Sequence, residues 1–368
     1  MSLKKDKYNN KDKLYMNLAL KLASARHGLT GPNPSVGCVI VKKDQIISIG
    51  QTGFGGRPHA EYNAIKSSHE NLKGSKMYVT LEPCNHYGKT PPCTDIIVSN
   101  KIKKVFYGIE DIDLKVKGKT SIILKSKNII VNKGLLSKKI KSFYEPYIYN
   151  RKFKIPYITG KIAISKNNLI YSKAKKKITD IYSDKFTHLL RYKNDAIMIS
   201  YKTLNIDNPK LNCRINGLSK FSPKRIILDK NLKTKIDSYI FKTAIKNNTI
   251  IFYHKANKKI ISKFKRKGIQ LIKSNLLNNK YFDLKSILFK LYKLDCRNLL
   301  VEGGNELSGS FIKKSLYNKF YLFKSPTKLS KFIPYKGFNY FKYLTQNYKS
   351  KSKIKTKIGK DSITLYKR

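Results

Sequence analysis

The sequence predicts an α/β protein made of two domains, residues 1–148 and residues 149–368. Three observations support this fold class. The chain has 368 residues, enough for two domains that each bury a hydrophobic core. Segments with helical periodicity alternate with short apolar segments in both halves. A basic stretch at 150–155 separates the two series.

The first half predicts helices and strands that alternate around a central sheet. Apolar residues at helical spacing predict a helix at 15–25, and short apolar runs predict strands at 36–41 and 45–50. Further predicted elements are a helix at 60–68, a strand at 77–81, a helix at 93–99, a strand at 104–108 and a closing helix at 137–149. Helices on both sides of one sheet would make a three-layer domain.

The second half repeats this alternation. Strands are predicted at 156–165, 196–199, 225–228, 249–253 and 299–301, and helices at 182–190, 258–267 and 284–292. Strands separated by helices predict a mostly parallel sheet. The lysine-rich run at 349–360 is predicted to be solvated strand surface.

The chain is strongly basic, with 78 Lys and Arg residues against 22 Asp and Glu and a formal net charge of +56. A field of this sign attracts nucleic acids. However, the excess is mostly Lys, it is spread along the whole chain, and many Asn, Ile and Tyr residues accompany it while Trp is absent. These residue types have A/T-rich codons, so genomic base composition explains the bias. We therefore expect no nucleic-acid partner.

Cysteine usage and the first residues indicate the compartment. Five cysteines are an odd number, widely spaced, which is ordinary for a reducing environment and does not suggest a disulfide framework. Residues 1–7 are charged, and no apolar segment follows them, so we expect no signal peptide. No apolar run reaches membrane-spanning length. The sequence predicts a cytoplasmic protein without a membrane partner.

One histidine and two cysteines predict a catalytic zinc site. His59, Cys84 and Cys93 are three ligands that zinc accepts, and they leave the fourth tetrahedral position open for water. Glu61 follows the histidine by two residues, where a helix is expected to begin, and it can move protons without binding the metal. The pattern matches the His-x-Glu and later Pro-Cys of zinc nucleobase deaminases.

The alternative to a catalytic zinc is a structural zinc site or two unrelated buried thiols. A structural site usually fills all four positions with protein ligands. It would not need Glu61 in register with His59. The catalytic interpretation is therefore favoured.

The stretch from Glu82 to Cys93 reads Glu-Pro-Cys-Asn-His-Tyr-Gly-Lys-Thr-Pro-Pro-Cys, with eight residues between its two cysteines. It resembles the deaminase half of the bifunctional deaminase/reductases of riboflavin biosynthesis. The resemblance implies a cytidine-deaminase-like fold and a Zn²⁺ ion held by the three ligands named above, with Glu61 as the proton shuttle.

The same resemblance implies how a phosphorylated pyrimidine substrate is held. The expected substrate-binding residues are Asn33, His86 and Lys89. Lys offers a point charge for a phosphate group. Two departures from the family pattern bear on this half. Thr52 stands where the family usually has a His, and Asp113 replaces an Asn in a loop that has also lost two prolines.

Landmarks in the second half resemble the reductase half of the same family, which is dihydrofolate-reductase-like in fold and uses NADPH. They are Leu-Arg-x-x-x-Asp-Ala-Ile at 190–197, Asp-Asn-Pro-x-Leu-x-x-Arg at 207–214 and Val-Glu-Gly-Gly at 301–304. The implied substrate-binding residues are Arg191, Leu211, Arg214 and Glu302. The implied cofactor-binding residues are Thr203, Asp207, Gly303 and Gly304.

Two departures lie in the reductase half. Asn167 and Asn168 occupy the place of a family Asp-Gly pair, and Lys177 that of a Trp beside the cofactor. Both changes are expected to loosen the cofactor pocket. One alternative that stays open is therefore a deaminase whose reductase domain serves as a scaffold. The other is a nucleoside or tRNA deaminase on the same zinc scaffold, which the positive charge of the chain would favour. We also expect a homo-oligomer.

Overall fold

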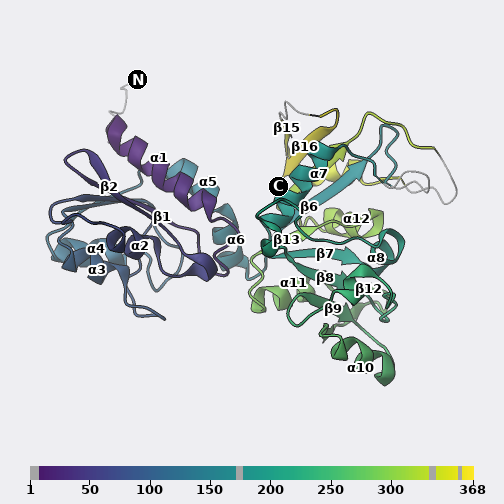
Figure 1. The fold of residues 1–368 in the computed structure, drawn as a ribbon. Coiled ribbons are helices and arrows are strands. Elements are labelled where there is room, and N and C mark those ends of the chain that lie inside the picture. Colours follow the sequence, from purple (N-terminus) through teal and green to yellow (C-terminus); the bar gives the residue numbers. More distant parts are fainter. Residues whose placement is uncertain (1–7, 171–176, 331–336, 355–358) are drawn as a thin grey trace. The chain divides into compact units, whose positions relative to one another are not determined.

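The computed structural model describes residues 8–170, 177–330, 337–354 and 359–368. It divides into two compact units, Met1–Lys154 and Ile155–Arg368 (Figure 1). The domain boundary expected at 148/149 falls inside the helix α6 (Glu145–Phe153). The charged segment 1–7, on which the signal-peptide expectation rested, lies outside the described residues.

Unit 1 is built on a five-stranded sheet with the order β2-β1-β3-β4-β5. The central strand β3 runs antiparallel to β1 and parallel to β4. The strand bounds are β1 Gly37–Lys42, β2 Gln45–Gln51, β3 Lys76–Leu81, β4 Lys104–Ile109 and β5 Ile130–Lys133.

Helices cover both faces of this sheet, which confirms the predicted three layers (Figure 1). Gly37 packs against the backbone of α1, and Gly50 packs against that of α2. Because Gly50 pairs with Cys38, the neighbour of Gly37, the two glycines face opposite sides of the sheet. The helices are α1 Asn10–Ala25, α2 Ala60–Lys66, α3 Cys93–Ser99, α4 Lys119–Ser126, α5 Ser137–Phe143 and α6.

Two predicted helices differ from those observed. Helix α1 begins five residues before the expected start, because the Asn9 side chain caps it by accepting a hydrogen bond from the Asp12 N–H at 2.7 Å. The single closing helix expected at 137–149 is wrong, since α5 and α6 are separate. The chain turns at Tyr144, whose hydroxyl bonds Thr80 Oγ1 at 2.7 Å, and Pro146 then lacks the N–H needed to continue α5.

Unit 2 contains a nine-stranded sheet with the order β10-β9-β8-β7-β13-β6-β14-β16-β15. It is parallel from β10 to β14, as predicted, and β16 and β15 add an antiparallel edge. The strand bounds are β6 Tyr157–Ile164, β7 Ala196–Ser200, β8 Lys224–Leu228, β9 Thr249–Tyr253, β10 Gln270–Lys273, β13 Asn298–Val301, β14 Lys319–Lys324, β15 Ser350–Ile354 and β16 Ser362–Lys367. A separate ribbon pairs β11 Leu276–Leu277 with β12 Tyr281–Phe282.

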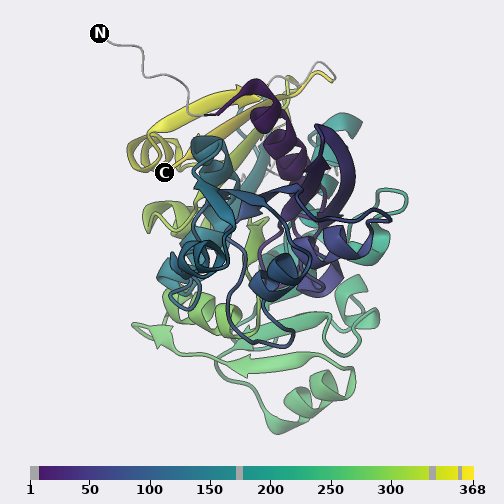
Figure 2. The same cartoon turned by 90° about the vertical axis from the view of Figure 1, so that its left-hand side faces the viewer.

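Helices again flank the sheet, and hydrophobic clusters fill both of its faces. Their bounds are α7 Ile181–Tyr192, α8 Tyr201–Asp207, α9 Tyr239–Lys242, α10 Lys258–Arg266, α11 Leu284–Lys293, α12 Asn305–Lys313 and α13 Phe341–Asn347. Strand β15, yellow in Figures 1 and 2, is an exposed edge strand, as expected for the lysine-rich run. Residues 355–358 of that run lie outside the described part of the chain.

Within the described residues, none of the helices combines the length and the apolar composition that crossing a membrane requires.

The Gly37→Ala substitution should destabilise unit 1. An added Cβ would collide with the main-chain carbonyl of Ala19 in α1, and a backbone carbonyl cannot swing aside as a flexible side chain can. We expect a loss of about 3 kcal/mol in the free energy of unfolding, measured by urea denaturation. In the control Gly74→Ala, the added Cβ meets open space, and the left-handed backbone (φ +81°) should cost only about 1 kcal/mol. Equal losses in the two variants would contradict the packing argument.

Candidate functional site

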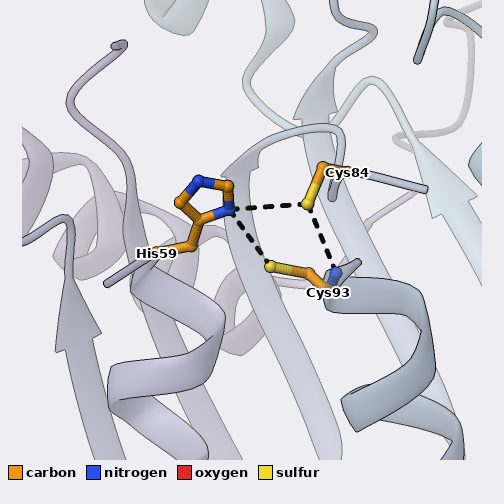
Figure 3. A group of neighbouring side chains, drawn as sticks. All are labelled: His59, Cys84 and Cys93. Carbon is orange, nitrogen blue, oxygen red and sulfur yellow. Dashed lines mark hydrogen bonds between the residues drawn. The ribbon is translucent and has the colours of Figure 1, made fainter. Parts of the chain in front are cut away.

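Three segments of unit 1 bring the predicted zinc ligands together (Figure 3). His59 is the N-cap of α2, Cys84 lies in the loop after β3, and Cys93 is the first residue of α3. His59 Nδ1 lies 3.4 Å from Cys84 Sγ and 3.4 Å from Cys93 Sγ. All three candidate ligand atoms lie within 4.8 Å of one another.

These distances fit a tetrahedral zinc ion. Bond lengths of about 2.3 Å to sulfur and about 2.0 Å to nitrogen place tetrahedral ligand atoms about 3.5 Å apart. The two sulfur–nitrogen separations of 3.4 Å are close to this value. Three protein ligands leave a fourth position for water, which is typical of catalytic rather than structural zinc sites.

The two thiols differ in how readily they lose a proton, Cys84 more readily and Cys93 less. A hydrogen bond from the Cys93 thiol lowers the pKa of Cys84 to about 4, and the Cys93 N–H also donates to Cys84 Sγ at 3.3 Å. The pKa of Cys93 is raised because its proton is shared with Cys84 and because the residue is buried. Zinc binds thiolates, so binding would displace the remaining proton.

Glu61 lies in the first turn of α2 and is buried, with 4% of its surface exposed. Burial raises the pKa of its carboxyl to about 7, although the nearby His59 charge acts in the opposite direction. A carboxyl group with a pKa near neutrality can both accept and return a proton. This is the chemistry expected of the residue beside the metal ligand.

Glu82 is a positioning residue that the sequence reasoning missed. Its carboxylate accepts hydrogen bonds from the backbone N–H groups of Asp111 and Gly118, both at 3.1 Å, and of Thr120 at 3.3 Å. It thereby ties the 111–120 loop to the strand end that carries Cys84. The available signal in the sequence was an acid between an apolar strand and the Pro-Cys pair. Such a position is expected to be buried, as Glu82 is, and a buried carboxylate needs hydrogen-bond donors.

The altered loop is ordered by other bonds as well. Asp113, which replaces the family Asn, accepts the Lys115 N–H at 3.1 Å, as an Asn side chain could. The Asn85 side chain donates to Val116 O and to Thr120 Oγ1, both at 3.0 Å. The loop therefore keeps a defined geometry without its two prolines.

The expected substrate-binding residues of unit 1 differ in their surroundings. Asn33 donates from Nδ2 to Gly56 O at 3.1 Å. His86 is half-buried, and its Nδ1 has no hydrogen-bond partner among the described residues. Lys89 is exposed. Thr52 is buried, and its hydroxyl accepts the Val36 N–H at 2.9 Å, so it holds the backbone together.

In unit 2, a buried ion pair joins two of the predicted substrate-binding residues. Arg191 in α7 contacts Glu302 after β13 through two bonds, Nε–Oε1 at 2.7 Å and Nη2–Oε2 at 2.9 Å. Burial favours the neutral carboxyl, but the Arg191 charge outweighs it and lowers the pKa of Glu302. This bidentate geometry fixes both side chains.

Lys161 in β6 is a second residue that the sequence reasoning missed. Gly160 pairs with Val301, so Lys161 and Glu302 are adjacent positions on neighbouring parallel strands. Burial lowers the pKa of Lys161, while the Glu302 charge acts to raise it. A lysine inside an otherwise apolar strand was the signal, because buried lysines need a partner or a function.

Two further predicted substrate residues lie after α8. Leu211 is buried in a hydrophobic cluster and has a left-handed backbone (φ +56°), so only its main chain is available to a ligand. Arg214 is exposed, and its Nη1 donates to Asn212 Oδ1 at 3.0 Å. The structure thus places the guanidinium of Arg214, but not the side chain of Leu211, where a ligand can reach it.

The predicted cofactor residues lie at the start of α12, in the first turn of α8 and at the end of α8. Gly303 and Gly304 lead from β13 into α12. Gly304 is the N-cap of α12 and has no side chain that could cap the helix. A Cβ added at Gly304 would lie 3.4 Å from Thr203 Oγ1, so the absence of a side chain keeps a cradle open between α8 and α12. Asp207 is exposed at the end of α8. A glycine turn at a helix start fits the pyrophosphate of a dinucleotide.

Comparisons with known proteins agree with both halves of this description. Residues 9–109 match the cytidine and deoxycytidylate deaminase zinc-binding region, and residues 160–331 match the RibD C-terminal domain. The riboflavin biosynthesis protein RibD of Aquifex aeolicus is 34% identical over 97% of this chain and 98% of its own length. This chain belongs to the RibD family.

Solved structures of RibD proteins share the whole fold. Acinetobacter baumannii RibD superposes with a TM-score of 0.84 at 26% identity, covering 97% of this chain and 98% of that one. A Thermotoga maritima deaminase/reductase gives 0.79 at 28% identity with the same coverage. The predicted fold class is confirmed, and membership of the family makes this chain a zinc-dependent deaminase joined to an NADPH-dependent reductase.

The departures from the RibD pattern in unit 2 preserve local structure. The Asn167 side chain accepts the Leu329 N–H at 3.1 Å and donates to Leu329 O at 2.8 Å. Asn168 adopts φ +63°, a left-handed conformation that Asn tolerates better than most residues with a side chain. Lys177 forms an exposed ion pair with Asp184, and residues 171–176 before it lie outside the described part.

The Cys93→Ser variant should lose zinc. Removing one of three protein ligands leaves a site too weak to retain the metal through purification, because serine binds zinc poorly. We expect metal analysis of the purified full-length protein to find little zinc in this variant. The control Cys38→Ala removes a buried thiol of β1 and should keep its zinc. Normal zinc in Cys93→Ser would contradict the ligand assignment.

Proposed function

We propose that unit 1 hydrolytically deaminates 2,5-diamino-6-ribosylamino-4(3H)-pyrimidinone 5′-phosphate, and that unit 2 then reduces the ribosyl group to ribityl. The observation that supports this most strongly is the His59, Cys84 and Cys93 cluster beside buried Glu61, in a chain related to RibD proteins over its full length. The Thermotoga maritima neighbour carries both of these activities in its name.

Glu61 carries the proton in the proposed deamination. Bound zinc lowers the pKa of water to about 7 and so supplies a nucleophile near neutral pH. The water oxygen would form a bond to the amine-bearing ring carbon. One of its protons would pass to the Glu61 carboxylate, and the other would end on the adjacent ring nitrogen when the carbonyl forms. Glu61 then returns the proton to the departing amine, so that the carbon–nitrogen bond breaks and ammonia leaves. Its burial keeps bulk water away from this transfer.

Asn33, His86 and Lys89 are proposed to hold the substrate around that carboxyl group. The unpartnered His86 Nδ1 is available for a polar group of the pyrimidine or ribose. Lys89 is exposed and can approach a phosphate as a point charge. The Asn33 amide already donates to Gly56 O, which leaves its oxygen to accept from the ring.

In unit 2, the proposed roles divide between cofactor and substrate. When bound, NADPH supplies the hydride. The cofactor would be held by Gly303 and Gly304 before α12, by Thr203 in the first turn of α8 and by Asp207 at its end. Glu302 orients Arg191 through their bidentate pair, and the adjacent Lys161 offers an N–H donor to the sugar. Arg214 and the Leu211 main chain would complete the substrate contacts.

The proposal also covers assembly and location. A homo-oligomer in the cytoplasm remains our expectation, and the five free thiols fit a reducing compartment. The phosphorylated substrate is a small anion, which a chain of net charge +56 attracts without needing a nucleic acid as partner.

The Glu61→Gln variant should be inactive as a deaminase but keep its metal. Glutamine retains the shape of the side chain and cannot carry the proton, so we expect ammonia release to fall by at least about a hundredfold. Zinc content should stay near stoichiometric. Exposed Glu70→Gln is the matched control and should behave like the wild type. Loss of zinc from the Glu61 variant would mean that this residue is structural.

NADPH binding separates an active reductase from a scaffold. Isothermal titration of the full-length protein should show binding, and Gly304→Val should weaken it by at least about tenfold because the branched side chain fills the space facing Thr203. The smaller Gly304→Ala change should have an intermediate effect. A wild-type protein that fails to bind NADPH at millimolar concentration would favour the scaffold alternative.

A further inference from the structure

Arg57 is a half-buried cation placed directly before Pro58 and the zinc ligand His59. The loop that carries it is closed on itself, because the Gly53 N–H donates to Pro58 O at 2.9 Å. The Asn33 side chain also holds the loop through Gly56 O. The backbone of Arg57 is therefore fixed relative to the metal cluster.

The guanidinium group of Arg57 extends over the loop that carries His86 and Lys89. Its Nη1 donates a hydrogen bond to Thr90 Oγ1. A Cβ added at Gly88 would lie 3.5 Å from Nη2.

Most of the donors of Arg57 are unused. Among the described residues, no carboxylate forms an ion pair with it, and Thr90 takes one of its five N–H groups. Only nine of the 78 basic residues are Arg. A guanidinium differs from the many lysines because its planar donors can grip an oxyanion through two parallel bonds.

Thr52 follows β2 and precedes the loop that carries Arg57. Thr52 is 2% exposed, and its hydroxyl accepts the Val36 N–H. It therefore cannot contact a ligand. Arg57 lies five residues further along the chain, and most of its N–H donors are unused within the described residues.

We propose that Arg57, together with Lys89, binds the 5′-phosphate of the deaminase substrate and makes this enzyme selective for the phosphorylated compound. This inference rests on the proposed function of unit 1. The competing role is mechanical: Arg57 could simply brace the 86–90 loop through Thr90.

Steady-state ammonia release by the zinc-loaded full-length protein tests the proposal. The substrates are the pyrimidine ribosyl 5′-phosphate and the same compound without its phosphate. Arg57→Gln should lower kcat/KM for the phosphorylated substrate by about tenfold or more and leave that for the dephosphorylated one nearly unchanged. The control Lys73→Gln removes one exposed charge just before β3 begins, at the end of the strand opposite to Cys84. It should change neither value.

Two further variants distinguish phosphate binding from bracing. Thr90→Val removes the hydrogen bond to the loop and should preserve the preference for the phosphorylated substrate. If it erases that preference as Arg57→Gln does, the proposal is overturned. Equal losses on both substrates in Arg57→Gln would overturn it too. Should that variant fail to fold, Arg57→Lys decides by the same comparison. A wild-type protein that deaminates neither compound would instead refute the proposed function, and this inference with it.

Discussion

The convergence of three side chains on one small volume constrains the whole of unit 1. His59, Cys84 and Cys93 come from a helix start, a strand end and another helix start, yet their ligand atoms lie within 4.8 Å. Such convergence requires α2 and α3 to approach the same edge of the sheet. Gly50 allows the close approach of α2, and Glu82 holds the loop beside Cys84. The scaffold thus supplies the geometry before any metal binds, which lowers the cost of ordering the site.

In unit 2, charged side chains are packed between the parallel sheet and a helix that covers it. Arg191 and Glu302 neutralise each other through two short bonds, and Lys161 lies one strand away. A buried pair of this kind contributes little net stability, because desolvation offsets its attraction. Its value is positional: the pair fixes where the charged groups face, at the carboxyl end of β13 and beside the middle of β6. Open α/β sheets bind their ligands at the carboxyl ends of their strands.

The sequence predicted most of the fold and the metal site, for identifiable reasons. Strands such as β7 and β9 carry runs of apolar residues, and the zinc ligands stand in a spacing with few alternatives. The break at Tyr144 was missed although Pro146 was a visible signal for it, whereas the buried bond of the Tyr144 hydroxyl to Thr80 could not be read from the sequence. The roles of Glu82 and Arg57 depend on partners 29 or more residues away, which local patterns do not report.

The backbone at Asn168 shows how a biased composition can coexist with an unchanged fold. Among the residues that the structure describes, six asparagines have positive φ: Asn128, Asn168, Asn208, Asn247, Asn278 and Asn279. Among the residue types that A/T-rich codons favour, Asn is the one whose short polar side chain tolerates this conformation. Mutational drift can therefore exchange glycine for asparagine at tight bends while the path of the main chain survives. At such turns, the steric limits on positive φ determine which substitutions leave the fold intact.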